Sequence, residues 1–423
     1  YYSKGCCPTI HHRGAIFSVL LNWTVIIAFG TLPYLLIERS SSVCNSFFES
    51  VIGYTSTGLS VFQNVEKLSK SILFYRSLTQ WVGGLGIIVL LTFLLPSGVC
   101  TKKLYDNETS VLDGELTAYS VKRISYGISM IYAALTLCCT LLFYKFGMSL
   151  FDAICHAFTT VSTGGLSTYN DGFMHFQSTG IKCTAIIFML IGGTNFQVIS
   201  SIFLFRRLVL KKNDEFKAYF IILGIMCGLI LILNRHILHP IDGIFQVVSA
   251  VTTTGFSATN ITMIPISYVL LLTMMLIGGC TGSTAGGVKI ARLLVIFKSI
   301  RQQIELVFRP RLVRALRINN NVIDQDVVLN HTSIFCLHII LIATTVFIIG
   351  IIQPLLNTSS ILAIVTASIS NAGIIFEPSS LNDIASLHTS TKIILSLIML
   401  LGRLEIYPIL CIFLRSFWGK RKN

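Results

Sequence analysis

Residues 241–260 read "IDGIFQVVSAVTTTGFSATN", and this stretch decides how the rest of the chain is interpreted. An apolar segment, 244–251, runs directly into three threonines, a glycine and a serine. With about 8 residues of helix-compatible character the segment is too short to cross a bilayer, which takes roughly 20. It is the right size for a re-entrant helix that enters the membrane and stops there.

The same plan occurs three more times in the chain. The counterparts are "FFESVIGYTSTGLSVF" at 47–62, "FDAICHAFTTVSTGGLSTYND" at 151–171 and "SSILAIVTASISNAGIIF" at 359–376. All four stretches align without gaps on Gly58, Gly165, Gly255 and Gly373. The intervals of roughly 100 residues suit two membrane spans plus loops in each unit, which indicates an internal repeat. Because Gly164 adjoins Gly165, either could be the counterpart of Gly58.

Composition places these units in a membrane. The 423 residues are 53% hydrophobic and 12% charged, whereas soluble proteins are about 25% charged. We expect about eight spans, at 15–36, 72–95, 124–146, 181–205, 217–234, 266–279 running on to 297, 332–353 and 391–414. The predicted fold is an all-α polytopic membrane protein with four membrane-helix, pore-loop, membrane-helix repeats around one central ion pore. The expected parts are a cytoplasmic stub at 1–14, which follows from the resemblance given below, and repeats at 15–100, 101–212, 213–325 and 326–423.

The charge distribution predicts the topology. The formal net charge is +14, but lysine and arginine gather in alternate loops rather than on one soluble face, which argues against a nucleic-acid partner. Cytoplasmic loops of membrane proteins carry this excess, so both termini are expected in the cytoplasm. The 12 cysteines include no C-x-x-C pair and predict no disulfide framework.

The breaks after the short helices suit a cation. Non-helical backbone at membrane depth is tolerated where protein buries it or where it lines a water-filled cavity. Backbone carbonyls replace the hydration shell of a cation, and the negative C-terminal ends of the short helices favour positive charge. The predicted metal-binding filter residues are Thr55, Ser56, Thr57, Gly58, Ser162, Thr163, Gly164, Gly165, Thr252, Thr253, Thr254, Gly255, Ser370, Asn371, Ala372 and Gly373.

Several strings together resemble the Trk/Ktr/HKT superfamily of potassium transporters, closest to its bacterial TrkH-type membrane subunits. They are "TSTGLS" at 55–60, "STGGLS" at 162–167, "TTTGFS" at 252–257, "SNAG" at 370–373, "QWVGGLGI" at 80–87 and "GGCTGSTAGGVKIAR" at 278–292. The resemblance covers nearly the whole chain, although the fourth unit lacks the threonines.

The resemblance implies a potassium pathway in the cytoplasmic membrane of a bacterium, with potassium as the transported ion and no organic cofactor. It also implies a homodimer and a cytosolic, nucleotide-binding regulatory subunit of the TrkA type. TrkH-type relatives carry two further helices before the first unit, so 1–14 is expected to be the stub of a missing pair.

The string "GGCTGSTAGGVK" at 278–289 interrupts an otherwise apolar span with five glycines. One interpretation is a kink or a close helix contact, since glycine is common in membrane helices. The other is a flexible intramembrane loop that occludes the pathway, and the resemblance implies the same gate. The expected gating residues in this string are Gly278, Gly279, Thr281, Gly282, Ser283, Thr284, Gly286, Gly287 and Lys289.

Arg403 and Glu405 place two charges in the apolar last span. Charged groups at membrane depth usually face a cavity or a partner, although an interfacial pair that reaches the cytoplasm would also explain them. The resemblance places both in the pore near the gating loop. We therefore expect Arg403 to act as a fixed positive barrier or a latch, with Glu405 and Lys289 as possible partners.

An enzyme and a coupled transporter are two alternatives to a simple potassium pathway. The sequence has no phosphate-binding loop of the G-x-x-x-x-G-K-[ST] type, no nucleophile elbow and no H-E-x-x-H, so an enzyme is not expected. A secondary transporter that couples potassium to sodium or protons is the main rival, although such transporters are usually built on inverted repeats.

Gln80, Asn195 and Gln197 are expected to form interhelical hydrogen bonds.

Overall fold

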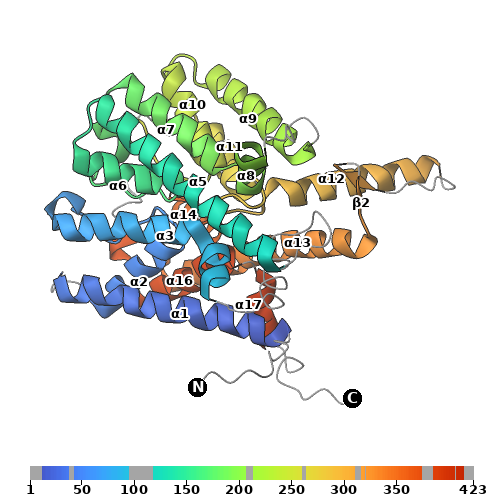
Figure 1. Cartoon of the computed structure of the whole chain (residues 1–423), viewed down its shortest axis with the longest axis horizontal. Coiled ribbons are helices and arrows are strands. Elements are labelled where there is room, and N and C mark those ends of the chain that lie inside the picture. Colours follow the sequence, from blue (N-terminus) through green and yellow to red (C-terminus); the bar gives the residue numbers. More distant parts are fainter. Residues whose placement is uncertain are drawn as a thin grey trace.

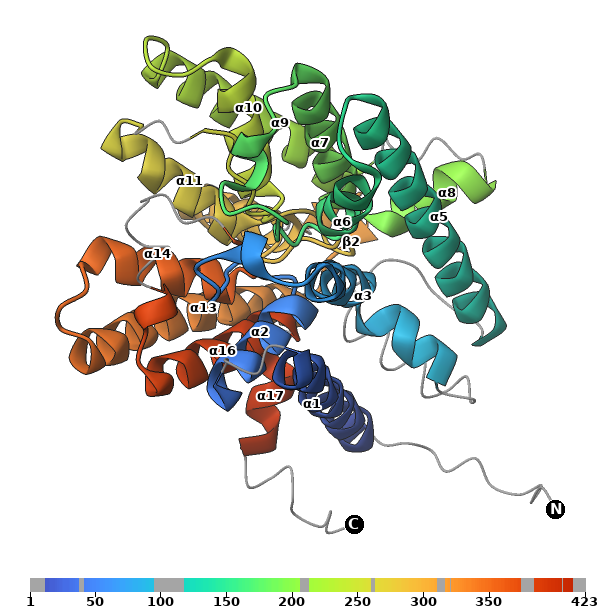
Figure 2. The same cartoon turned by 90° about the vertical axis from the view of Figure 1, so that its left-hand side faces the viewer.

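The computed structural model describes residues 12–37, 42–94, 118–205, 213–259, 263–309, 316–319, 321–373, 384–404 and 406–413. The predicted all-helical class is confirmed, with one small addition among these residues. Strands β1 (Arg317–Ile318) and β2 (Asn321–Val322) form an antiparallel hairpin between two helices. The four helical units follow one another in chain order around a common centre (Figure 2).

The first helix of each unit is long and uninterrupted. These helices are α1 (His12–Ile37), α5 (Ala118–Lys145), α9 (Asp214–Leu233) and α13 (Gln325–Ile352). Within the described ranges, each contains a stretch that is long and apolar enough to cross a membrane, and they are the four helices that do. Large apolar side chains on their outer faces are exposed, including Phe29 at 68% and Phe347 at 70%. This exposure suits contact with lipid.

The second element of each unit is a short helix that ends inside the protein. The four, which we call the pore helices, are α2 (Val43–Tyr54), α6 (Leu150–Val161), α10 (Pro240–Val251) and α14 (Thr358–Ile369), each of 12 residues. They are longer than the predicted 8 or so residues because capping residues or a proline start them about one turn earlier. Ser42 and Ser149, for example, cap α2 and α6 by accepting backbone N–H groups.

The last part of each unit returns across the protein as an interrupted helix. The pieces are α3 (Lys70–Leu94), α7 (Thr179–Gly192) with α8 (Phe196–Phe205), α11 (Pro265–Ile277) with α12 (Ile290–Phe308), and α16 (Thr389–Arg403) with α17 (Ile406–Phe413). Within α3 the break is a kink at Gly86, where φ is 70°. The apolar runs predicted at 72–95, 181–205 and 391–414 are therefore each interrupted, at Gly86, between Gly192 and Phe196 and between Arg403 and Ile406.

The pore helices form the buried middle of the protein. Phe48, Val247 and Val365 on three of them are fully buried, and each pore helix packs against the first helix of its own unit. Short 3-10 turns, η1 (Val65–Lys67) and η2 (Gly172–His175), lie in the connections that follow the first two pore helices. Helix α12 projects away from the body beside the start of α13 (Figure 1).

Candidate ion pathway

All four pore helices end in the same way. The second residue after each helix has a left-handed backbone, with φ of 55° at Ser56, 53° at Thr163, 54° at Thr253 and 49° at Asn371. The next residue donates its N–H to the carbonyl five positions back: Thr57 to Ile52 at 3.0 Å, Gly164 to Thr159 at 2.8 Å, Thr254 to Ser249 at 2.9 Å and Ala372 to Ala367 at 2.9 Å. This is the Schellman termination, which usually carries glycine at the left-handed position. Non-glycine residues there cost about 1–3 kcal/mol each, so their surroundings hold them in place.

The shared termination resolves which glycine of the second unit matches the others. Thr163 takes the place of Ser56, so Gly165 takes the place of Gly58, while Gly164 stands where the first unit has Thr57. A Cβ at Gly164 would come within 2.9 Å of Nε2 of Gln80 and closer still to the rest of its amide. The first glycine of the pair therefore leaves room for Gln80, and the second is the counterpart of Gly58.

The four matching glycines meet one another. A Cβ added to Gly255 would lie 2.5 Å from the Cα of Gly373, and one added to Gly165 would collide with Thr254 and lie 3.2 Å from the Cα of Gly255. A Cβ at Gly373 would collide with Gly58, whose own Cβ would approach Gly373 and Gly165. Each of these glycines is partly exposed, whereas the three residues before it are buried. The glycines thus form a closed ring that faces a shared space, and we call it the glycine ring.

The polar side chains next to the ring are arranged alike in the first and third units and differently in the fourth. In the first, Thr55 and Thr57 hydroxyls lie 2.9 Å apart, and in the third the matching pair, Thr252 and Thr254, lies 2.7 Å apart. The fourth unit has Asn371 instead, whose Nδ2 donates to Thr57 Oγ1 at 3.2 Å and to the Met399 carbonyl at 2.9 Å. Asn371 therefore links the fourth segment to the first and to α16, an arrangement that its sequence did not reveal.

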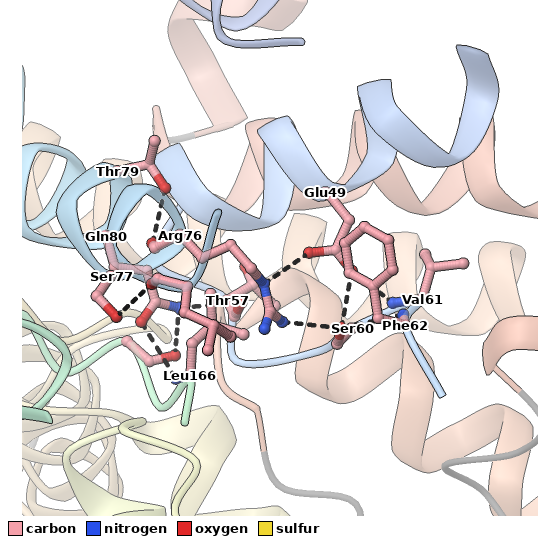
Figure 3. A network of polar contacts seen from close by, with 12 residues as sticks. Glu49, Thr57, Ser60, Val61, Phe62, Arg76, Ser77, Thr79, Gln80 and Leu166 are labelled. Carbon is pink, nitrogen blue, oxygen red and sulfur yellow. Dashed lines mark hydrogen bonds and ion pairs between the residues drawn. The ribbon is translucent and has the colours of Figure 1, made fainter. Parts of the chain in front are cut away.

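Gln80 on α3 joins the first two units, because it bonds both Thr57 and Leu166 (Figure 3). Its Nε2 donates to the carbonyls of Gly164 at 2.7 Å and Thr57 at 3.3 Å, and its Oε1 accepts from Leu166 N at 3.2 Å. The side chain is fully buried. We expected Gln80 to bond between helices, but it bonds the backbone of the two ring segments.

A buried ion pair supports the first unit from α2 and α3. Arg76 Nε lies 3.4 Å from Glu49 Oε2, both side chains are at most 2% exposed, and Arg76 also donates to Ser60 Oγ at 2.9 Å. The other carboxylate oxygen of Glu49 accepts from Ser60 Oγ at 2.8 Å and Val61 N at 2.6 Å, as Figure 3 shows. These hydrogen bonds complete the pair only in part, since Glu49 Oε2 and Arg76 Nε meet each other as an ion pair and, like Arg76 Nη1, make no hydrogen bond among the described residues.

The glycine-rich segment between α11 and α12 is a loop, and we call residues 278–289 the inner loop. Its backbone has positive φ at Gly278, Gly282, Gly287 and Lys289. Residues 278–289 are therefore a loop rather than a kink in a continuous helix.

The inner loop packs directly against the ends of the pore helices. Thr284 Oγ1 lies 3.1 Å from Thr163 Oγ1, and Gly286 N donates to Thr253 Oγ1 at 2.8 Å. A Cβ at Gly286 would collide with the Ser370 carbonyl, so the loop approaches the fourth unit too. Contacts to three units place the inner loop immediately beside the glycine ring.

Arg403, the last residue of α16, connects the inner loop to the first unit. Its guanidinium donates to the carbonyls of Thr284 at 2.9 Å and Gly83 at 2.5 Å. Two carbonyls on different elements suit the planar fork of arginine. The expected partner Glu405 lies outside the described residues, and Lys289 lies at the end of the inner loop, among the charges that act on Glu215.

Glu215, at the start of α9, was missed by the sequence analysis. Its Oε1 accepts from Thr281 N at 2.5 Å and Thr281 Oγ1 at 2.8 Å, and the side chain is buried. The preceding residue, Asp214, is bound to Lys298 of α12 at 2.8 Å and to Asn319 of the hairpin. An acidic pair at a helix start ordinarily indicates only a favourable helix dipole, so no sequence signal pointed to the loop.

The break between α7 and α8 also contacts the inner loop. Cys280 N donates to the Gly193 carbonyl at 2.9 Å, and a Cβ at Gly282 would lie 3.1 Å from Asn195 Oδ1. Asn195 therefore lies against the loop, whereas the side chain of Gln197 is not described. The inner loop therefore bonds the second unit through Gly193 and the fourth through Arg403, and Arg403 links it to Gly83 of the first unit.

Comparison with known proteins gives consistent matches over nearly the whole chain. The TrkH family, described as a cation transport protein, matches residues 9–420. The chain is 33% identical to the Trk system potassium uptake protein TrkH of Vibrio parahaemolyticus, over 96% of this chain and 86% of that protein. It is 32% identical, with the same coverage, to the protein of that name from Escherichia coli. The crystal structure of the potassium transporter TrkH from Vibrio parahaemolyticus matches with a TM-score of 0.84 and 29% identity, covering 99% of this chain and 88% of that one.

Proposed function

This chain belongs to the TrkH family of cation transport proteins, and from that premise we propose that it carries potassium ions into the cell through the glycine ring. It is a membrane transport protein and not an enzyme, because its family and its relatives are transport proteins. The observation that carries the proposal is the glycine ring, four glycines that follow four identically terminated helices and meet around a shared space.

The ring suits a dehydrated potassium ion. The residues proposed to form the filter are those predicted from the sequence, 55–58, 162–165, 252–255 and 370–373, with Gly165 as the ring glycine of the second unit. Their backbone carbonyls supply the oxygen ligands, and the helix ends contribute negative potential. A carbonyl oxygen has two lone pairs, so Thr57 and Gly164 can accept from Gln80 and still coordinate an ion.

The inner loop is the proposed gate. Its contacts with Thr163, Thr253 and Ser370 support a position on the ion pathway, because these residues lie in the segments that end in the ring glycines. Arg403 bridges the loop to α3 and acts as a latch, while its charge opposes a cation that lies close by. Glu215 anchors the other side of the loop through Thr281. Opening requires these bonds to break or exchange.

The proposed setting is the cytoplasmic membrane of a bacterium, with both termini inside the cell. We also propose a homodimer and regulation by a cytosolic nucleotide-binding subunit of the TrkA type, as the family resemblance implies. The stretches of sequence between α3 and α5 and between α12 and α13 are short, which supports a separate regulator, because domains typically need at least about 50 residues.

Reconstitution into liposomes tests this function. Purified protein in vesicles should take up K+ when a K+ gradient is the sole driving force, and should carry Na+ much more slowly. Uptake that requires a Na+ or pH gradient would instead identify a coupled secondary transporter. Vesicles that carry K+ no faster than protein-free vesicles, with regulatory subunit present or absent, would overturn the proposal.

A further inference from the structure

Three of the four ring segments are tied back to their pore helices by the same kind of side-chain contact. In each case a polar residue on the pore helix contacts a serine located 11 residues later. The pairs are Glu49 Oε1 with Ser60 Oγ at 2.8 Å, His156 Nε2 with Ser167 Oγ at 2.9 Å, and Gln246 Nε2 with Ser257 Oγ at 2.8 Å.

These pairs occupy matching positions in the repeat. Ser60, Ser167 and Ser257 each stand two residues after a ring glycine. The helix residues Glu49, His156 and Gln246 all precede the left-handed residue of their unit by the same interval. All three helix side chains are buried, at 0%, 0% and 2% exposure. The glycine lies between the two ends of each contact in the chain, so each contact closes a small loop that contains the ring backbone.

The contact is conserved in position while its chemistry changes. Ser60 donates to the Glu49 carboxylate, which is held by Arg76. His156 Nδ1 lies 2.9 Å from the Asp152 carbonyl, so it carries the hydrogen, and Nε2 of the neutral ring accepts from Ser167.

In the third unit the direction is reversed. The hydroxyl of Ser257 donates to the Thr259 carbonyl at 3.1 Å, so the Gln246 amide is the donor to Ser257. Three different side-chain chemistries therefore make one geometric link, which indicates that the link itself matters.

The fourth unit departs from this pattern. Its matching helix position holds Ile364, which is buried and has no hydrogen-bonding group, and the matching serine position holds Ile375, outside the described residues. The fourth segment is instead linked through Asn371 to Thr57 and to α16. The ring therefore has three segments fixed from behind by this contact and one fixed from the side.

We propose that the pairs Glu49–Ser60, His156–Ser167 and Gln246–Ser257 are positioning residues that hold the glycine ring at the width required for potassium. The inference rests on the proposed function above and adds a cause for ion preference. Sodium is the smaller ion, so its coordination requires the carbonyls to move inward. Glycine offers little resistance to such a movement because its backbone is permissive. Each contact supplies that resistance from outside the ring.

The test uses single substitutions that remove one hydroxyl each: Ser60→Ala, Ser167→Ala and Ser257→Ala. The matched control is Ser396→Ala, which also removes a buried hydroxyl, bonded to the carbonyl of Lys392 in its own helix at 2.8 Å. The readout is the ratio of initial Na+ to K+ uptake by the same batch of vesicles. Loss of folded protein lowers both rates and leaves this ratio unchanged.

We expect each substitution to raise the ratio of Na+ to K+ uptake about threefold to tenfold, because the loss of one net hydrogen bond changes an equilibrium by about that factor. The Ser396→Ala control should keep the wild-type ratio. Gln246→Leu should match Ser257→Ala, and the double variant should show no more than either single variant, because both remove one contact.

The outcomes separate this inference from the function on which it rests. Suppose that the wild type prefers K+ and that all three serine variants keep its Na+ to K+ ratio within about twofold, a smaller change than the loss of one net hydrogen bond produces. This result would overturn the positioning role alone. Additive effects of Gln246→Leu and Ser257→Ala would also overturn it, because the residues would then act separately. A wild type that carries Na+ as readily as K+ would overturn the proposed potassium filter, and this inference with it.

Discussion

Replacement of Arg403 by lysine separates a latch from a simple charge barrier. Arg403 donates to two carbonyls, on Thr284 of the inner loop and Gly83 of α3, at 2.9 and 2.5 Å. Hydrogen bonds from a charged donor contribute about 1.5–3 kcal/mol each, but the guanidinium is partly exposed and would be hydrated once the loop moves. A net contribution of about 1–3 kcal/mol to the closed loop follows, equivalent to about 5–150-fold in the equilibrium between loop positions.

Lysine keeps the positive charge, but its compact ammonium lacks the planar fork that spans the two carbonyls. The latch therefore predicts that Arg403→Lys raises K+ uptake about fivefold or more, and that Arg403→Met raises it further because the charge is also lost. Vesicle uptake of K+ per folded protein is the measurement. Arg301→Lys serves as the control, since Arg301 is 80% exposed and pairs with Glu305 on the same helix. Wild-type uptake in Arg403→Lys together with raised uptake in Arg403→Met would refute the latch and leave the barrier.

Three further predictions concern the supports of the ring and the loop. Glu215→Gln should raise K+ uptake about fivefold, because Thr281 loses a charged acceptor. Equal uptake by the variant and the wild type would show that Glu215 does not hold the gate closed. Gln80→Leu should lower the free energy of unfolding by about 2–3 kcal/mol, since three hydrogen bonds are lost, and thermal denaturation in detergent measures this. Arg76→Met should destabilise the protein by about 3–5 kcal/mol by leaving the Glu49 charge buried and unpaired. Adding Glu49→Gln to Arg76→Met should restore most of that loss in the same denaturation experiment, and no recovery would contradict the ion-pair account.

The fold could be predicted because its signals are local. A span of apolar residues, a glycine after a short apolar helix and a fourfold recurrence are all visible in the sequence. The breaks in α3, between α7 and α8 and between α16 and α17 were not predicted, because one or two glycines or charges in an apolar run do not by themselves end a membrane helix.

The site could be predicted only where a residue acts through its own segment. The ring glycines were identified from spacing, yet the choice between Gly164 and Gly165 needed the backbone angle at Thr163. Glu215 acts on a loop 66 residues away and Gln80 acts on a segment 84 residues away. The contact of His156 with Ser167 was found only in the structure, beside the matching pairs of the first and third units. Contacts of this kind are set by tertiary packing and leave no periodic signal.

The central claim, that the glycine ring selects potassium, is tested most directly by Gly255→Ser. Gly255 has φ of 94°, and a Cβ there would lie 2.5 Å from the backbone of Gly373, so a side chain must displace the ring. Gly228→Ser is the matched control, because a Cβ at Gly228 in α9 meets no atom within 4 Å. We predict that Gly255→Ser lowers the K+ to Na+ uptake ratio about tenfold or more, the size of effect expected for about 1.4 kcal/mol, while Gly228→Ser keeps it. A Gly255→Ser protein that folds, transports and retains the wild-type ratio would contradict the claim.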